Sequence, residues 1–369
     1  MSNVAGTHDP DVADAQSWLR FASVANLGPA SQRKLLSAFG SPQEVFAASR
    51  ADLLRVVSST AVSALQAGPD DHVVQTALAW LSEAGNYLLT IADSRYPRAL
   101  LEIADPPLLL FAKGRLELLR QPALAVVGSR SASAGGARDA QSFAEVLSNA
   151  GLTIVSGLAL GIDAAAHRGG LAGASSSIGV VGTGLDKVYP ARNRQLAHQL
   201  AEQGVLLSEF PLGTPPLPGN FPRRNRVISG LSRGVLVIEA ALRSGSLITA
   251  RQALDQGREV YAIPGSIHSP VAKGCHWLIK QGAKLVETAQ DVLEELSMAA
   301  PRVEAAHEAV QLDPAAATLL SSLGFEPIDL DTICERAGIA AEVASNLLLS
   351  LELAGYVARL PGGLLQRMQ

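Results

Sequence analysis

Short apolar runs, rich in valine, isoleucine and leucine, recur through the middle of the chain and alternate with stretches of helical periodicity. The runs predict strands at 87–91, 108–112, 123–127, 152–156, 177–181, 205–208, 234–238, 259–263 and 284–286. Most of these strands are separated by predicted helices, such as 136–149, 162–169, 193–202 and 246–256. Strands of this kind, bounded by glycine and alternating with helices, predict an α/β fold with a doubly wound parallel sheet.

The chain has a different pattern on either side of this α/β core, which spans 85–296. Residues 1–14 contain several aspartates and no apolar run, which predicts a disordered tail, and 15–80 form a predicted helical domain. An Ala- and Glu-rich linker is expected at 297–309. Residues 310–369 have the order helix, glycine turn, second helix and Gly-Gly hairpin, which is the outline of a winged helix-turn-helix.

The helical domain contains Leu27-Gly28-Pro29 between two predicted helices. This order resembles a helix-hairpin-helix, whose turn presents backbone N–H groups to a DNA phosphate. The second hairpin of such a domain falls near 57–60 and lacks the glycine. Both a scaffold or protein-contact role and a DNA contact therefore stay open for this domain.

Composition limits the class of protein. With 48% hydrophobic and 17% charged residues in 369 positions, the chain is expected to be a soluble multidomain protein. Cys275 and Cys334 lie far apart, which argues against a disulfide framework or a zinc site. We find no signal-peptide pattern and no stretch apolar enough to span a membrane, so we expect a cytoplasmic protein without a membrane partner.

Charge is unevenly distributed along the chain. Residues 121–290 carry 16 Lys and Arg against 10 Asp and Glu, whereas the remaining residues carry 14 against 24. A basic middle between acidic ends predicts an anionic ligand for the core alone.

The turns that follow the predicted strands suit such a ligand, because ligands of open α/β sheets bind outside the carboxyl ends of the strands. The turns lie at 128–131, 157–163, 182–187 and 264–266, and most of them place glycine beside a hydroxyl or a cation. Arg223, Arg224 and Arg226 crowd one turn before a strand, and Ser244-Gly245-Ser246 begins a helix whose N–H groups can bind an anion. Together they predict a phosphate site, although the arginines alone are also compatible with a solvated surface cluster.

Several enzyme motifs are absent or ambiguous. Gly182-x-Gly184 lacks the third glycine of a dinucleotide fingerprint, and no Gly-Lys-Ser/Thr is present for a Walker-type ATPase. Asp163 and His167 could form an acid–base pair, or could cap and pack their helix. Glu239 is a candidate catalytic carboxylate or a structural one. Phe221 could stack on a base or lie in the core.

Eight motifs in a fixed order carry a resemblance to a known family. They are Val-Gly-Ser-Arg (127–130), Ser-Gly-Leu-Ala-Leu-Gly-Ile-Asp (156–163), Gly-x-Asp-x-x-Tyr-Pro-x-x-Asn (184–193), Ser-Glu-Phe-Pro (208–211), Phe-Pro-x-Arg-Asn-Arg-x-Ile-Ser-Gly-Leu-Ser (221–232), Glu-Ala-x-x-x-Ser-Gly-Ser-Leu-Ile-Thr (239–249), Ile-Pro-Gly-Ser (263–266) and Gly-Cys-His-x-Leu-Ile (274–279). The chain from about 90 to 290 thus resembles the DprA (Smf) family of DNA-processing proteins.

The resemblance implies an extended Rossmann core that binds single-stranded DNA without sequence preference, dimerises and loads the recombinase RecA during natural transformation. It implies no catalytic residue, metal or cofactor. The DNA- or phosphate-binding residues expected from the resemblance and the turns together are Gly128, Ser129, Arg130, Gly157, Lys187, Phe221, Arg223, Arg224, Asn225, Arg226, Gly245 and Ser246.

Two other interpretations stay open. The core also resembles nucleotide phosphoribohydrolases, which cleave a base from a nucleoside monophosphate, but it lacks their Pro-Gly-Gly-x-Gly-Thr signature. A winged helix favours a sequence-specific regulator, yet residues 310–369 hold three arginines, no lysine and seven acidic residues. The excess of acidic residues should repel DNA. The leucines of 347–353 suit an apolar contact, so we expect this unit to bind another protein or a second copy of itself.

Overall fold

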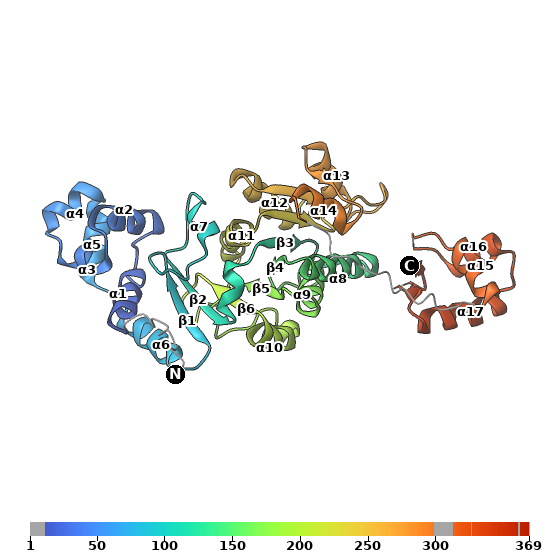
Figure 1. Cartoon of the computed structure of the whole chain (residues 1–369), viewed down its shortest axis with the longest axis horizontal. Helices are drawn as coiled ribbons and strands as arrows, with labels where there is room; N and C mark the ends of the chain where they lie inside the picture. The colour runs from blue at the N-terminus through green and yellow to red at the C-terminus, as the bar shows by residue number, and fades with distance from the viewer. Residues whose placement is uncertain (1–11, 299–312, 326, 361, 369) are drawn as a thin grey trace, which may run out of the picture. The chain divides into compact units, whose positions relative to one another are not determined.

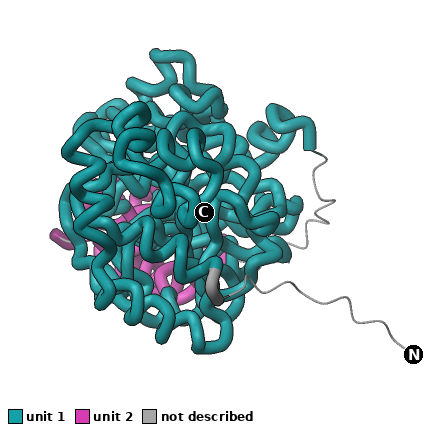
Figure 2. Tube along the Cα trace, turned by 90° about the vertical axis from the view of Figure 1, so that its left-hand side faces the viewer, with its two compact units in different colours: residues 1–132, 136–300 teal, residues 133–135, 301–369 magenta. Residues whose placement is uncertain are grey.

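The computed structural model describes residues 12–298, 313–325, 327–360 and 362–368. The chain divides into two compact units, 1–132 with 136–300 and 133–135 with 301–369 (Figure 2). The expected disordered tail falls largely on residues 1–11, outside the described part, and its last residues belong to a helix that begins at Val12. Most of the expected linker, from 299 onward, also lies outside the described residues.

The core of the first unit is a nine-stranded sheet in the order β1-β2-β6-β5-β4-β3-β7-β8-β9 (Figure 1). Its strands are β1 (Asn86–Thr90), β2 (Leu109–Gly114), β3 (Ala123–Val127), β4 (Thr153–Ser156), β5 (Ser177–Val180), β6 (Val205–Ser208), β7 (Gly234–Val237), β8 (Glu259–Ala262) and β9 (Lys284–Leu285). Every strand predicted for this region is present, with its ends shifted by two residues at most.

The parallel doubly wound sheet is confirmed for β3 to β9, which pair in parallel. The two remaining strands extend it at one edge, where β2 runs antiparallel to both β1 and β6. Strand order reverses between β3 and β7, because the chain builds outward through β4, β5 and β6 and then returns to the far side of β3. This reversal is the topological switch point, where open α/β sheets bind ligands.

Helices cover both faces of the sheet, which is why its strands are apolar on both faces. Figure 1 shows α12 and α13 on one side and α9 and α10 on the other. Alternate residues of β3 separate accordingly, with Ala125 and Val127 in one buried cluster and Leu124 and Val126 in another. The core helices are α7 (Arg98–Leu101), α8 (Ala134–Asn149), α9 (Ile162–Ala172), α10 (Arg194–Gln203), α11 (Asn220–Gly230), α12 (Ser246–Asp255), α13 (Lys273–Lys280) and α14 (Ala289–Glu295).

Helix α11 is the main departure from the predicted secondary structure. The sequence places the three arginines in a turn, whereas the structure forms an 11-residue helix with Pro222 near its start. Proline has no N–H to donate and its fixed φ suits the first turn of a helix, so Pro222, the third residue of α11, does not break it. The helical spacing puts Arg223 and Arg226, three residues apart, on one face and directs Arg224 elsewhere.

The helical domain comprises α1 (Val12–Ala22), α2 (Pro29–Phe39), α3 (Pro42–Ala47), α4 (Arg50–Val56), α5 (Ser59–Ala67) and α6 (Asp71–Leu81). Gly28 is the N-cap of α2, and α4 and α5 form the second hairpin with Ser58 as the cap. The domain packs on the β1–β2 edge of the sheet. Trp18 and Val74 join Leu88 and Phe111 there in one buried cluster.

The second unit has its own small core. Helices α15 (Pro314–Ser322), α16 (Leu330–Ala337) and α17 (Ala341–Leu353) precede a hairpin of β10 (Val357–Arg359) and β11 (Leu365–Arg367). This is the predicted winged-helix arrangement. Leu348 and Leu351 are buried in its core, whereas Leu349 is 53% and Leu353 82% exposed. Only part of the leucine-rich helix therefore serves the core of this unit.

Among the described residues, no helix combines the length and apolar character needed to cross a membrane.

Candidate phosphate-binding site

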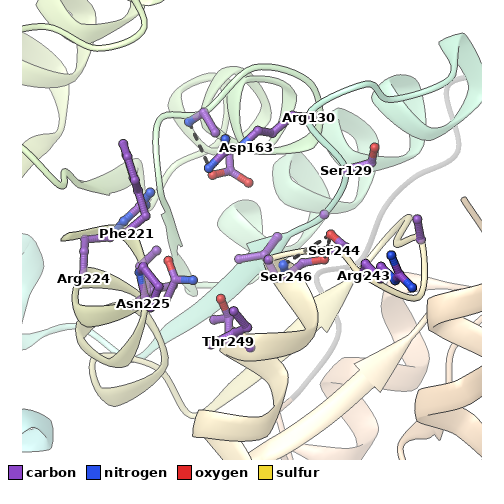
Figure 3. A pocket seen from close by; sticks show the side chains of 18 of the residues that line it. Ser129, Arg130, Asp163, Phe221, Arg224, Asn225, Arg243, Ser244, Ser246 and Thr249 are labelled. Atoms are coloured by element: carbon purple, nitrogen blue, oxygen red, sulfur yellow. Dashed lines mark hydrogen bonds between the residues drawn. The ribbon is translucent and has the colours of Figure 1, made fainter. Parts of the chain in front are cut away.

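A cavity of about 680 Å³ opens at the carboxyl ends of β3 and β7, at the switch point of the sheet (Figure 3). It is formed by the loop after β3, helix α11 and the loop that leads from β7 into α12. We call this cavity the arginine pocket. The predicted residues that line it are Gly128, Ser129, Arg130, Phe221, Arg224, Asn225, Gly245 and Ser246.

The loop after β3 holds Arg130 at the mouth of the arginine pocket. Gly128 is needed for the tight packing below, because a Cβ there would lie 2.6 Å from Ile162 Cγ1 and 2.8 Å from the Glu239 carbonyl oxygen. The Ser129 carbonyl accepts the Ile162 N–H at 3.1 Å, which ties this loop to the start of α9. Arg130 is exposed, and its guanidinium lies over Phe221, 5.5 Å from the ring centroid. It makes no hydrogen bond to the described residues, so its N–H donors are available to a ligand.

Arg224 lies deeper in the arginine pocket and is 5% exposed. Its Nη1 donates to the Val180 carbonyl at 3.0 Å, and its Nε has no acceptor among the described residues. Gly157 makes room for it, since a Cβ at that position would overlap the guanidinium. Gly157 therefore does not line the cavity itself but permits Arg224 to reach it.

Asp163 is the buried carboxylate beside Arg224. Its Oδ2 accepts the N–H groups of Gly157 at 3.2 Å and Ala159 at 3.4 Å. Burial raises the pKa of Asp163, and the Arg224 charge and these two N–H groups oppose that change. Burial likewise lowers the pKa of Arg224 to about 10, so the arginine remains charged at neutral pH. The two charges offset one another, and a phosphate would meet a buried cation already held in place.

The start of α12 offers fewer N–H groups than the sequence predicts. Gly245 is the N-cap, but the Ser246 amide donates to Ser244 Oγ, and those of Leu247 and Ile248 donate to nearby carbonyls. Gly245 has an ordinary φ of −63°, and a Cβ there would meet no protein atom within 4 Å. The protein itself thus does not require glycine at this position, whereas a ligand lying close to the helix start would.

Aromatic side chains form one wall of the arginine pocket. Phe221 lies between the Arg130 and Arg224 guanidiniums, 5.5 and 6.0 Å from their Cζ atoms. The exposed ring of Tyr189 lies beside it, with 5.8 Å between the ring centroids. A base that entered the cavity would find an aromatic face next to phosphate-binding groups, as proteins that bind single strands provide.

Arg223 and Arg226 lie on the opposite face of α11 from the arginine pocket. Both donate to Glu209 Oε2, with Arg223 Nε at 3.1 Å and Arg226 Nη2 at 2.5 Å, and Arg226 also pairs with Asp105 at 3.1 Å. Arg226 is buried, and Lys187 is exposed outside the cavity with its Nζ bonded to the Gly213 carbonyl. The sequence predicts Arg223, Arg224 and Arg226 as one cluster of phosphate ligands. In the structure, α11 directs Arg224 into the arginine pocket and the other two toward Glu209.

Arg243 is a cavity residue that sequence reasoning missed. It lines the arginine pocket, is exposed, and has no hydrogen bond or ion pair in the described part of the chain. Its position directly before Ser244-Gly245-Ser246 is the signal that could have identified it. Arg130, Arg224 and Arg243 therefore supply the cations of the site (Figure 3).

Two of the candidate acid–base groups, His167 and Glu239, do not line the arginine pocket. His167 is fully buried, with Nδ1 2.7 Å from Ser177 Oγ and Nε2 accepting the Leu158 N–H at 3.3 Å, and burial lowers its pKa to about 3. The Glu239 carboxylate packs directly against Gly136 and does not line the arginine pocket. No group of three or more potential metal ligands occurs within the described ranges.

Comparison with known proteins gives consistent matches. Residues 87–297 match the family described as DNA recombination-mediator protein A, and residues 303–363 match the DprA winged helix domain. The chain is 47% identical to Protein Smf of Escherichia coli over 298 residues, which cover 79% of this chain and 80% of that protein. It is 52% identical to the DNA processing protein DprA of Streptococcus pneumoniae over 206 residues, covering 56% and 73% of the two chains.

Two solved structures are also similar. The X-ray structure of DprA from Streptococcus pneumoniae aligns with a TM-score of 0.62 at 40% identity, covering 74% of this chain and 95% of that one. DNA processing protein A from Helicobacter pylori, described for its single-stranded DNA binding mode, aligns with a TM-score of 0.52 at 28% identity. That match covers 57% of this chain and 95% of the other.

Proposed function

Since the chain belongs to the family of DNA recombination-mediator protein A, whose members are named DprA or Smf, we propose that its arginine pocket binds single-stranded DNA. The observation that carries this proposal is the arrangement of Arg130, Arg224 and Arg243 around one cavity beside the ring of Phe221. The single-stranded DNA binding described for the Helicobacter pylori relative supports it.

The binding is independent of sequence in this proposal. Guanidiniums and the loop at Gly128 and Ser129 suit phosphate oxygens, which are the same for every nucleotide. The faces of Phe221 and Tyr189 can stack on any base, but only where the base is unpaired. The pocket therefore favours a single strand over a duplex and carries little base discrimination.

We propose further that the protein acts in natural transformation, in the cytoplasm and without catalysis or a cofactor. In this role it would deliver the bound strand to the recombinase RecA, and the family resemblance supports this partner.

We also propose that the core forms a homodimer. An exposed apolar surface on α12, α13 and the loop before α12 supports this, with Leu242, Ile248, Leu254 and Trp277. Burial of such a surface is the usual reason for a stable self-contact.

Affinity should depend steeply on salt, which provides the central test. If roughly three to five phosphates are neutralised per protomer, the logarithm of the single-strand affinity should fall with log salt at a slope of about −2 to −3.5. The measurement is fluorescence anisotropy with single-stranded and duplex oligonucleotides of equal length. Equal affinity for the two forms would contradict the selectivity for single strands.

Arg130→Ala should weaken single-strand binding for all sequences alike and reduce the magnitude of the salt slope by about 0.7. Thermal stability should change little, because this exposed guanidinium lies over the Phe221 ring and makes no hydrogen bond or ion pair within the described residues. Arg168→Ala is the matched control, since Arg168 is also exposed on the core but does not line the pocket. A wild-type slope in Arg130→Ala would show that the pocket is not the binding site.

Removal of the winged-helix unit, with the chain ending after Met298, should leave single-strand affinity within a few-fold. The unit has an independent core, and its three arginines are outnumbered by seven acidic residues, so it should repel a polyanion. Analytical ultracentrifugation alongside the binding assay checks that the shortened protein is folded and in the same oligomeric state. Loss of most affinity in such a protein would assign DNA binding to the winged helix instead.

A further inference from the structure

A second cavity, of about 200 Å³, lies between the helical domain and the core, on the other side of α11 from the arginine pocket. We call it the proline cleft. Its walls include the rigid rings of Pro29, Pro106, Pro107 and Pro211, and Arg33, Arg223 and Arg226 also line it. The helical domain and the sheet belong to the same compact unit.

The charges of the proline cleft favour an anion. Glu209 is buried, at 4% exposure of its side chain, and its Oε2 is shared by Arg223 and Arg226. Arg223 nevertheless stays 45% exposed, and it lies over the Phe210 ring at 5.3 Å from the centroid. It is thus a cation held in one position with part of its guanidinium open to solvent.

Arg33 gives the cleft its unbalanced positive charge. It is partly buried on α2 and has no hydrogen bond or ion pair within the described residues. Arg33 and Arg223 line the same cleft, and two like charges repel one another. A phosphate bound between them would offset this repulsion and accept hydrogen bonds from both guanidiniums.

The segment after β6 connects the two cavities. Pro211 lines the proline cleft, whereas Pro216 and Pro218 line the arginine pocket, so this segment passes from one to the other. Lys187, which belongs to the loop after β5, contacts this segment, because its exposed Nζ donates to the Gly213 carbonyl at 2.5 Å. Asp186 Oδ1 accepts the Gly213 N–H at 2.8 Å and fixes the same contact from the other side. A cation therefore lies along the route between the cavities.

We propose that the proline cleft is a second phosphate subsite for the same single strand, reached from the arginine pocket past Lys187. This inference rests on the proposed function, because it extends the path of the bound strand. Arg33 and the open side of Arg223 receive one phosphate group there, and the proline rings contact the adjoining sugar and base. The helical domain then contributes to DNA binding through a side chain of α2.

The test uses the full-length chain and oligo(dT) strands of increasing length. Strands that fill only the arginine pocket should bind Arg33→Ala and wild type equally. For longer strands, Arg33→Ala should bind roughly two- to fivefold more weakly, as expected for one exposed ion pair. The salt slope for those strands should be smaller in magnitude by about 0.7, the contribution of one single-strand phosphate. Arg33→Glu should enlarge both effects.

Arg55→Ala is the matched control, because Arg55 is an exposed arginine of the same domain that pairs with Asp52 and does not line the cleft. Wild-type affinity and slope of Arg33→Ala at every length, with Arg130→Ala weakened at every length, would overturn the second subsite and leave the first intact. Failure of the wild type to bind any strand would instead overturn the proposed function.

Discussion

Replacement of Arg224 by alanine should lower both the stability of the fold and its affinity for single-stranded DNA. The side chain is buried beside Asp163, and its removal takes away the larger of the two arginine charges that stabilise this carboxylate. Loss of one partner from a buried charge pair costs roughly 3–5 kcal/mol. Urea unfolding measures this cost, and fluorescence anisotropy measures the affinity of the variant that remains folded.

The pH dependence of this variant has a defined sign. Without Arg224 the Asp163 pKa should rise further, because burial raises it and the arginine charge opposed that rise. A carboxyl with a raised folded pKa contributes stability below its unfolded pKa and loses it as the pH rises through the folded value. The stability deficit of Arg224→Ala relative to wild type should therefore be larger at about pH 8 than at about pH 5.

Asp163→Asn in the Arg224→Ala background separates the two roles of the arginine. The double variant should regain part of the lost stability, since no buried charge is left unpaired, but should not regain DNA affinity. Recovery of affinity together with stability would mean that Arg224 only supports the fold. Wild-type stability of the single variant would show that its charge is not needed by Asp163.

Arg226→Ala should behave differently from Arg130→Ala, although the sequence assigns both residues to phosphate. Arg226 bridges Glu209 and Asp105 and is buried, so its loss should destabilise the fold by roughly 3–5 kcal/mol. DNA affinity should fall only to the extent that α11 shifts. Urea unfolding and anisotropy on the same preparation distinguish these two effects.

Glu209→Gln combined with Arg226→Gln provides the control for this prediction. If the two groups act as a pair, the double variant should be less destabilised than the sum of the single variants. An Arg226→Ala protein of wild-type stability but weak DNA affinity would restore Arg226 to the phosphate-binding set. It would also contradict the position of its side chain in the structure.

The positions of the strands and of the loops that follow them could be predicted from the sequence. Valine and isoleucine runs that end in glycine are local signals, and the carboxyl ends of parallel strands meet at one edge. Gly128, Ser129 and Arg130 follow β3, and Gly245 and Ser246 follow β7, so the prediction brought together two loops more than a hundred residues apart. The motifs also indicated the family, which the comparisons show.

The division of the arginines could not be predicted in the same way. Arg223, Arg224 and Arg226 are nearly adjacent in sequence, and only the helical phase of α11 decides which face each one occupies. Their partners come from distant parts of the chain: Asp163 from the start of α9, and Glu209 from the end of β6.

Local sequence thus determined the strands, the glycine turns and the chemical types present at the edge of the sheet. The tertiary structure decided which cations remain available to a ligand. Arg130 and Arg243 stay exposed, and the charge of Arg224 is partly offset by Asp163. Arg226 forms ion pairs with Glu209 and Asp105 and is therefore not available to a ligand. The physical reason is that the charge available at a surface depends on burial and on neighbouring groups, which are set by packing between distant segments rather than by the order of residues in one motif.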